Sequence, residues 1–286
     1  MKIVRTVHDL RDEVRLARGA GDRIGLVPTM GAFHDGHLSL IRWARESCGF
    51  VVVSLFVNPA QFNEAADLDR YPRDEARDRE MAEQAGASVL FAPSVDDVYP
   101  VGFATSVEVP SLAAPLEGVV RGTQHFRGVA TVVTKLLNMA QPDSAFFGQK
   151  DAQQALIIRR LVRDLDLPVQ VVVCPTVREP DGLAMSSRNV LLGADARRRA
   201  PALSRALFAV ADAVAKGETR ADAALDRGRG ILAQERIEPE YFAAVSVESL
   251  APVETIVNET LVALAARFGN VRLIDNVVVG ERNAAP

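Results

Sequence analysis

The chain has 286 residues, of which 48% are hydrophobic and 24% charged, and its formal net charge at pH 7 is -4. This length accommodates one large or two modest domains, and the weakly acidic balance excludes a general attraction for nucleic acid or anionic lipid. Charges interleave with the first apolar residues and no uncharged run reaches spanning length, so we expect neither a signal peptide nor a membrane segment. We therefore expect a cytoplasmic protein, and Cys48 and Cys174 lie in apolar surroundings that favour buried, reduced thiols.

The chain begins with a predicted strand over 2–4 and an amphipathic helix that ends at a glycine pair. An apolar strand over 24–27 then leads into the stretch 28–37, Pro-Thr-Met-Gly-Ala-Phe-His-Asp-Gly-His, after which apolar residues recur at helical spacing from Leu38. Backbone N–H groups at the start of a helix lack partners within the helix and attract anions. This strand, glycine-bearing turn and helix therefore predict a phosphate site.

Two histidines in this stretch, His34 and His37, are three residues apart and face the same way on a first helical turn. Two imidazoles beside a phosphate can donate hydrogen bonds to its oxygens and help to neutralise developing charge. One alternative is a pair of surface histidines spaced in this way by chance, and another is a metal pair. No third ligand of matching spacing is near, and we expect no metal site. Since the chain has neither a Walker-type motif nor a dinucleotide fingerprint, the phosphate site belongs to another class.

The next predicted strand, 50–57, is apolar on both faces, as in a parallel sheet covered by helices on both sides. Ligands of such sheets bind beyond the carboxyl ends of the strands, where Asn58 and Gln61 follow. Asn-Pro is also a common turn starter, which would explain Asn58 without a ligand but does not explain Gln61. A polar helix over about 74–85 and a strand over 88–91 continue the alternation of a doubly wound sheet.

From Pro93 to about residue 127 the chain loses its periodicity, and such a long irregular stretch in a compact domain is more often functional than idle. A helix with an apolar core stripe is predicted from Gly128.

A second strand, turn and helix arrangement follows over 143–147, 148–151 and 152–164. Its turn, Gly-Gln-Lys-Asp, places Lys150 at a strand end, where it is either an ordinary solvated lysine or a partner of a phosphate. Gln153 and Gln154 lie on the first turn of the helix, and we expect one of them to face the same ligand crevice as Lys150.

The last strand of this domain, 169–174, precedes a polar segment over 177–189 that contains two serines and Arg188. Such a cluster can clamp a polyphosphate, and the alternative is a helix cap within a linker. We expect 181–189 to be mobile without nucleotide, because its glycine and serines give it few apolar anchors.

The composition then shifts to an Ala-, Arg- and Asp-rich helical region over 194–236, followed by three short strand patterns. We therefore expect an α/β protein of two domains. The first is a doubly wound, Rossmann-like parallel-sheet domain over 1–177. The second is a smaller α+β domain over 178–286 that carries the Ser-Ser-Arg-Asn loop at its start, and only 282–286 are expected to be disordered.

These motifs together resemble one family, the pantothenate synthetases. The stretch 28–37 is similar to the His-x-Gly-His motif of class I aminoacyl-tRNA synthetases and related nucleotidylyl transferases. Further segments match the family in order and type: 56–62, 71–73, 147–154 and 177–189. The resemblance is strong over about 1–192 and extends to the remainder by length and layout.

The resemblance implies an ATP-dependent ligase that condenses (R)-pantoate with β-alanine to pantothenate, in the biosynthesis of vitamin B5 and coenzyme A. The carboxylate of pantoate attacks the α-phosphorus of Mg-ATP to give pantoyl adenylate and pyrophosphate, and the amine of β-alanine then displaces AMP. The family further implies Mg²⁺ with the ATP, pantoate and β-alanine as small-molecule partners, a homodimer, and no nucleic-acid or membrane partner.

The same resemblance assigns roles to residues of this sequence. The donors implied for catalysis are His37, His34, Lys150 and Arg188. The residues implied to bind ATP are Met30, Gly31, Ala32, Phe33, His34, Asp35, Gly36, His37, Gly148, Gln149, Lys150, Asp151, Val177, Met185, Ser186, Ser187 and Arg188. Pantoate is assigned to Gln61 and Gln154, and β-alanine enters at Gln61.

Two departures from the family pattern stand out. The segment 121–126 is one residue longer than the usual Arg-Pro-x-His-Phe, which leaves the roles of Arg121 and His125 open. Gln149 stands where a glutamate is common, beside the retained Lys150.

Three other classes of protein share some of these features. A nucleotidylyl transferase acting on a phosphorylated cofactor precursor would share the histidine motif, but it needs a second anion pocket and leaves Gln61 and Gln154 unexplained. A non-catalytic nucleotide-binding module needs no substrate pocket, and three separate phosphate-facing segments disfavour it. A tRNA-charging enzyme would want a basic anticodon-binding domain, whereas this chain is acidic.

Overall fold

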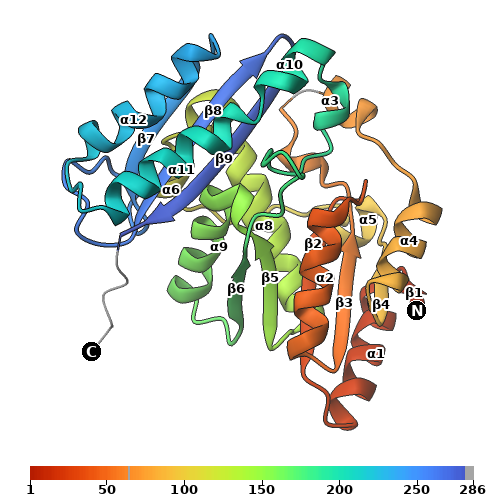
Figure 1. The fold of residues 1–286 in the computed structure, drawn as a ribbon. Helices are drawn as coiled ribbons and strands as arrows, with labels where there is room; N and C mark the ends of the chain where they lie inside the picture. The colour runs from red at the N-terminus through yellow and green to blue at the C-terminus, as the bar shows by residue number, and fades with distance from the viewer. Residues whose placement is uncertain (64, 281–286) are drawn as a thin grey trace. The chain divides into compact units, whose positions relative to one another are not determined.

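The computed structural model describes residues 1–63 and 65–280, and the chain divides into two compact units, Met1–Pro175 and Thr176–Pro286 (Figure 1). The expected disordered tail over 282–286 lies outside the described residues. Within the described ranges, no helix is both long and apolar enough to cross a membrane.

The first unit is built on a six-stranded sheet in which every neighbouring pair is parallel, in the order β1-β4-β3-β2-β5-β6 (Figure 1). Its strands are β1 (Lys2–Val4), β2 (Ile24–Thr29), β3 (Phe50–Leu55), β4 (Val89–Phe91), β5 (Ser144–Gly148) and β6 (Gln170–Cys174). The chain runs from β2 outward through β3 and β4, and then returns to place β5 on the other side of β2. The direction of winding therefore switches between β2 and β5, which is where parallel sheets bind their ligands.

Helices connect these strands, as the expected alternation requires. They are α1 (Val7–Gly19), α2 (Asp35–Ser47), η1 (Pro59–Gln61), α3 (Ala65–Arg70), α4 (Glu75–Gln84), α5 (Val95–Val98), α6 (Pro110–Ala113), α7 (Glu117–Arg121), α8 (Thr123–Ala140), η2 (Gln149–Asp151) and α9 (Ala152–Asp164). The stretch expected to be irregular thus contains three short helices. The prediction that α8 begins at Gly128 is wrong, because its polar first turn starts at Thr123 and carries no apolar period.

The core of this unit packs α2 and α4 against the sheet. Leu38, Ile41 and Ala44 recur at helical spacing on α2 and are buried, which packs the helix against β2 and β5 (Figure 1). Cys48 and Cys174 are buried free thiols, as expected, and burial raises the pKa of Cys174 to about 11.

The second unit contains a three-stranded antiparallel sheet, β7-β8-β9 (Figure 1). Its elements are η3 (Asn189–Leu191), α10 (Ala194–Arg199), α11 (Ala202–Ala215), α12 (Ala221–Gln234), β7 (Pro239–Ser246), β8 (Thr260–Phe268) and β9 (Val271–Val279). A separate core joins residues of α11 and α12, such as Leu207 and Leu225, to Val262 and Leu264 of β8. The expected α/β class, with a parallel sheet followed by a smaller α+β part, is confirmed.

Candidate active site

The predicted site residues of the first unit follow three adjacent strands. The segment 30–37 follows β2, Gln61 lies on η1 after β3, and the segment 148–151 ends β5 and forms η2. Lys150 lies close enough to lower the pKa of both His34 and His37 electrostatically. The structure therefore brings the histidines and the lysine together at the switch point of the sheet.

Backbone N–H groups of the turn between β2 and α2 already have acceptors within the chain. Gly31 donates to Thr29 Oγ1 at 3.4 Å, and Ala32 and Phe33 donate to the two carboxylate oxygens of Asp78 at 2.8 Å each. Asp78 comes from α4 and is only 1% exposed. The N–H groups of Ala32 and Phe33, which precede the first turn of α2, are therefore already paired with a carboxylate of the chain.

The two histidines cap the start of α2 with their own rings. His34 Nδ1 accepts from the Gly36 N–H at 3.1 Å, and His37 Nδ1 accepts from the His34 N–H at 3.4 Å. The ring centroids are 4.2 Å apart, so the rings do lie side by side as expected. Because Nδ1 accepts in each neutral ring, the ring proton is on Nε2, which is left to donate to a ligand.

Both rings are neutral at pH 7. Burial, with a smaller contribution from His34, lowers the pKa of His37 to about 3, and burial followed by the charge of Lys150 lowers the pKa of His34. Neutral imidazoles donate hydrogen bonds to a phosphate oxygen but bring no positive charge. A positive charge beside the two rings that can balance a phosphate is that of Lys150.

A chain of side-chain hydrogen bonds orients Gln61. Tyr99 donates its hydroxyl to Asn58 Oδ1 at 2.8 Å, and Asn58 Nδ2 donates to Gln61 Oε1 at 3.0 Å and to the carbonyl of Gly128 at 3.1 Å. Since the oxygen of Gln61 is taken, its amide nitrogen is the group left to donate to a substrate. Sequence reasoning singled out Asn58 and Gln61 but missed Tyr99.

The longer segment around Arg121 and His125 supports the same region. His125 Nδ1 donates to the backbone carbonyl of Gln61 at 2.8 Å, and Arg121 Nε donates to the buried Glu117 at 2.9 Å. His125 therefore holds the backbone of Gln61, and Arg121 neutralises a carboxylate.

The two glutamines of α9 have different surroundings. Gln153 is 5% exposed, accepts from the Glu117 N–H at 3.0 Å and donates to the carbonyls of Leu112 and Pro115. The hydrogen bonds of Gln153 therefore fix the backbone before α7. Gln154 is partly exposed and is the glutamine that can contact a ligand.

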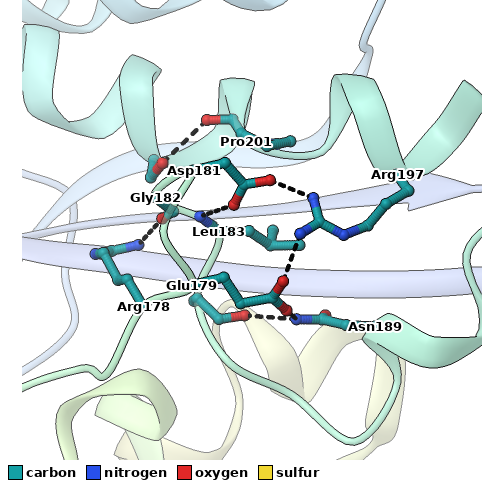
Figure 2. Close-up of polar contacts among 10 residues, drawn as sticks. Arg178, Glu179, Asp181, Gly182, Leu183, Asn189, Arg197 and Pro201 are labelled. Carbon is teal, nitrogen blue, oxygen red and sulfur yellow. Dashed lines mark hydrogen bonds and ion pairs between the residues drawn. The ribbon is translucent and has the colours of Figure 1, made fainter.

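In the second unit, the segment before η3 is anchored at both ends (Figure 2). Arg197 pairs with both Glu179 and Asp181, and Asn189 Nδ2 donates to Glu179 Oε1 at 2.6 Å and to the carbonyl of Ala184 at 3.1 Å. Ala184 is buried, and so is the preceding residue, Leu183. The segment 181–189 therefore has apolar anchors at Leu183 and Ala184, and the predicted phosphate-binding residues 185–188 form a short span between fixed points. Its mobility without nucleotide stays a prediction.

This fold and site define a parallel α/β enzyme that handles a phosphate-bearing substrate. The family profile described as pantoate-beta-alanine ligase matches residues 2–278. The chain therefore belongs to the pantoate–β-alanine ligase family, which confirms the resemblance seen in the motifs. Its activity is the ATP-driven joining of pantoate to β-alanine.

Relatives and solved structures agree over nearly the whole length. The chain is 49% identical over 280 residues to a pantothenate synthetase of Roseiflexus sp. (strain RS-1), covering 98% of this chain and 99% of that one. The crystal structure of pantothenate synthetase from Thermus thermophilus is 47% identical with a TM-score of 0.90, covering 98% of this chain and 100% of that one. A pantoate-beta-alanine ligase from Francisella tularensis, complexed with beta-gamma ATP and β-alanine, is 32% identical with a TM-score of 0.75 and covers 97% of each chain.

Proposed function

We propose that this chain condenses (R)-pantoate with β-alanine in two steps, with pantoyl adenylate as the intermediate, and so supplies pantothenate for coenzyme A. One observation carries the proposal: two neutral imidazoles and Lys150 meet at the switch point of the sheet, and Gln61 follows the adjacent strand β3. A phosphate partner and a small polar acid can therefore bind next to each other. The Francisella tularensis relative complexed with beta-gamma ATP and β-alanine supports this pairing of ligands.

The residue roles follow from this arrangement and from the family resemblance. We propose, from the family resemblance, that the residues that bind ATP are 30–37, 148–151, Val177 and 185–188. Gln61 and Gln154 hold pantoate, and β-alanine enters beside Gln61.

In the first step a carboxylate oxygen of pantoate attacks the α-phosphorus of ATP. The bond from that phosphorus to the bridging oxygen breaks, and pyrophosphate leaves with the electron pair. Negative charge builds on the departing oxygens, where Lys150, Arg188 and the Nε2–H groups of the two histidines can stabilise it. The protein supplies positioning and charge, with no covalent intermediate of its own.

In the second step the free amine of β-alanine attacks the acyl carbon of the adenylate. The bond from carbon to the AMP oxygen breaks, and the amine loses a proton as the amide forms. AMP leaves easily, whereas the oxide that a free carboxylate would have to expel does not. This difference is the chemical reason for activating pantoate first.

The residues also fit a magnesium ion that arrives on the phosphates. Within 1–63 and 65–280 no three His, Cys, Asp or Glu side chains gather into a metal cage. Asp151 lies near enough to affect the pKa of both histidines, and Mg²⁺ binds through one or two carboxylates together with substrate phosphates. Asp151 would hold the ion, and the ion would supply further positive charge beside the phosphates.

We propose a homodimer in the cytoplasm. The support is the family resemblance together with the two buried free thiols, which suit a reducing compartment. Light scattering should therefore give about twice the chain mass of 30.9 kDa. A mass of one chain across the concentration range would contradict the dimer.

The two-step order is tested by isotope exchange. Labelled pyrophosphate should pass into ATP when pantoate and Mg²⁺ are present and β-alanine is absent, because adenylate formation is reversible. Acetate in place of pantoate is the control and should support no exchange. Exchange that requires β-alanine, or that proceeds equally without pantoate or another acid, would contradict the two-step proposal and favour a nucleotidylyl transferase.

The role of Lys150 is tested by Lys150→Ala in the same assay. Loss of one donor to the departing phosphates should slow exchange roughly a hundredfold. Lys216→Ala, an exposed lysine of the second unit, is the matched control and should keep the wild-type rate. A folded Lys150→Ala protein with near wild-type exchange would remove Lys150 from the mechanism.

A further inference from the structure

Asp78 is a buried carboxylate that the reaction itself does not use, yet it bonds the turn that carries the histidines. We propose that Asp78 is a positioning residue: its carboxylate takes the place of a ligand anion at the turn and sets the backbone that presents His34 and His37. The inference rests on the proposed roles of these two histidines.

The geometry is that of a carboxylate held by two adjacent amides. Oδ2 accepts from Ala32 and Oδ1 from Phe33, both at 2.8 Å, and the side chain is 1% exposed. A carboxylate that lies so deep is unfavourable unless its oxygens are hydrogen-bonded. Both oxygens are satisfied by the turn, so α4 and the turn are fixed to each other.

The turn has an unusual backbone that depends on this acceptor. Gly31 has φ +86° and Ala32 has φ +54°, and the left-handed region is unfavourable for alanine. A Cβ on Gly31 would lie 2.7 Å from Asp78 Oδ2, so a glycine is needed for the carboxylate to approach. Without the carboxylate, two adjacent N–H groups would point at an empty space in a strained turn.

The turn passes directly into the two rings. Phe33 is 1% exposed within the core, and its ring centroid is 5.5 Å from that of His37. His34 follows in the chain, and its N–H donates to His37 Nδ1. A shift of the Phe33 backbone therefore moves both imidazoles, and with them both Nε2–H donors.

The experiment compares Asp78→Asn and Asp78→Ala in pantoate-dependent pyrophosphate exchange. The asparagine keeps the shape but turns an N–H₂ toward one of the amides, and we expect the maximal exchange rate to fall about a hundredfold with little change in KM for ATP. Asp78→Ala leaves a space of carboxylate size. Added formate should raise the exchange rate of this variant about tenfold, because formate can accept hydrogen bonds from both amides. Chloride at equal ionic strength should have no such effect.

Two controls separate positioning from general stability. Asp74→Ala removes the exposed cap of the same helix, where Asp74 accepts from the Arg77 N–H, and it should keep the exchange rate while lowering the melting temperature. His37→Ala should be slow and should not respond to formate. Circular dichroism should confirm that each variant is folded. If Asp78→Ala does not fold, the exchange rate of Asp78→Asn alone tests the inference.

A wild-type rate in Asp78→Asn, or a folded Asp78→Ala protein that formate does not restore, would overturn the inference. Failure of the histidine roles has a different outcome, namely a His37→Ala protein with wild-type exchange. In that case the amide signals of Ala32 and Phe33 in nuclear magnetic resonance still decide whether Asp78 holds the turn. Their hydrogen exchange should be slow in the wild type and fast in Asp78→Asn, and equal exchange would again overturn the inference.

Discussion

His37 lies on the first turn of α2, and its pKa of about 3 keeps the ring neutral at pH 7. An ordinary histidine titrates at about 6.5 and would impose a limb on the rate profile there. We therefore expect that titration of His37 causes no change in kcat/KM for pyrophosphate exchange between about pH 5 and about pH 8. The check is a pH profile of the wild type beside His37→Gln. A limb near the ordinary value that the glutamine variant abolishes would show that His37 acts as a cation.

The lowered pKa of His37 also predicts how stability depends on pH. The unfolded chain takes up a proton on this side chain below about pH 6.5, whereas the folded protein does so only near the lowered pKa of about 3. The unfolding free energy should therefore fall as the pH drops through this window, by up to about 1.4 kcal/mol per pH unit. Urea titrations at several pH values should show a shallower dependence in His37→Gln. An unchanged slope in that variant would place the titrating group elsewhere.

Tyr99 gives a prediction about pantoate. Tyr99→Phe removes the hydroxyl that donates to Asn58, and Asn58 then fixes the amide of Gln61 less firmly. KM for pantoate should rise about threefold to tenfold, while KM for ATP should stay unchanged. Tyr241→Phe, in the second unit, is the matched loss of a hydroxyl and should alter neither constant. Equal changes in both KM values would mean that Tyr99 acts on the fold and not on Gln61.

Sequence patterns could predict some of these residues and not others, for a physical reason. His34, His37 and Lys150 lie at strand ends before helices, and such local patterns are visible in a single sequence. Asp78 and Tyr99 act on partners 45 and 41 positions away, and no local pattern reports such pairs. One signal was available for Asp78, since it lies four residues before Ala82 on the buried face of α4.

At the scale of elements, the segment 185–188 lies between residues whose contacts depend on Arg197. Arg197 pairs with Glu179 and Asp181, and Glu179 accepts a hydrogen bond from Asn189. Arg197→Met should free Glu179 and Asp181, speed hydrogen exchange over 185–188 severalfold, and raise KM for ATP more than it lowers kcat. Arg198→Met is the matched control, because the neighbouring Arg198 is 71% exposed and pairs only on the surface with Asp195. Unchanged exchange in Arg197→Met would show that Asn189 alone fixes the segment.

Element boundaries were predictable where apolar periodicity was strong. The helix expected over 152–164 has those bounds in the structure, because its apolar stripe runs from end to end. The first turn of α8 was missed because its residues are polar, and the six residues of α3 were missed because a short polar helix has no period to detect. Helices of this length are stabilised by their surroundings and not by their own sequence.

At the scale of the whole molecule, each of the two units has its own hydrophobic core. The division was predicted after residue 177, shortly after the last expected strand of the first domain, and in the structure the chain divides between Pro175 and Thr176. The shift in composition begins only at about residue 194, so composition locates this boundary less sharply than packing does. Experiment can show whether the two units also unfold separately.

Ile41→Ala and Leu207→Ala answer that question, one in each core, since both side chains are 0% exposed. Each truncation should cost about 2–5 kcal/mol of unfolding free energy. If the cores are separate cooperative units, Ile41→Ala should speed hydrogen exchange in β2 and β3, and Leu207→Ala in β8 and β9, each leaving the other sheet protected. Exchange resolved by segment measures this directly. Faster exchange in both sheets from either variant would mean that the chain unfolds as one unit, and the division would then describe packing alone.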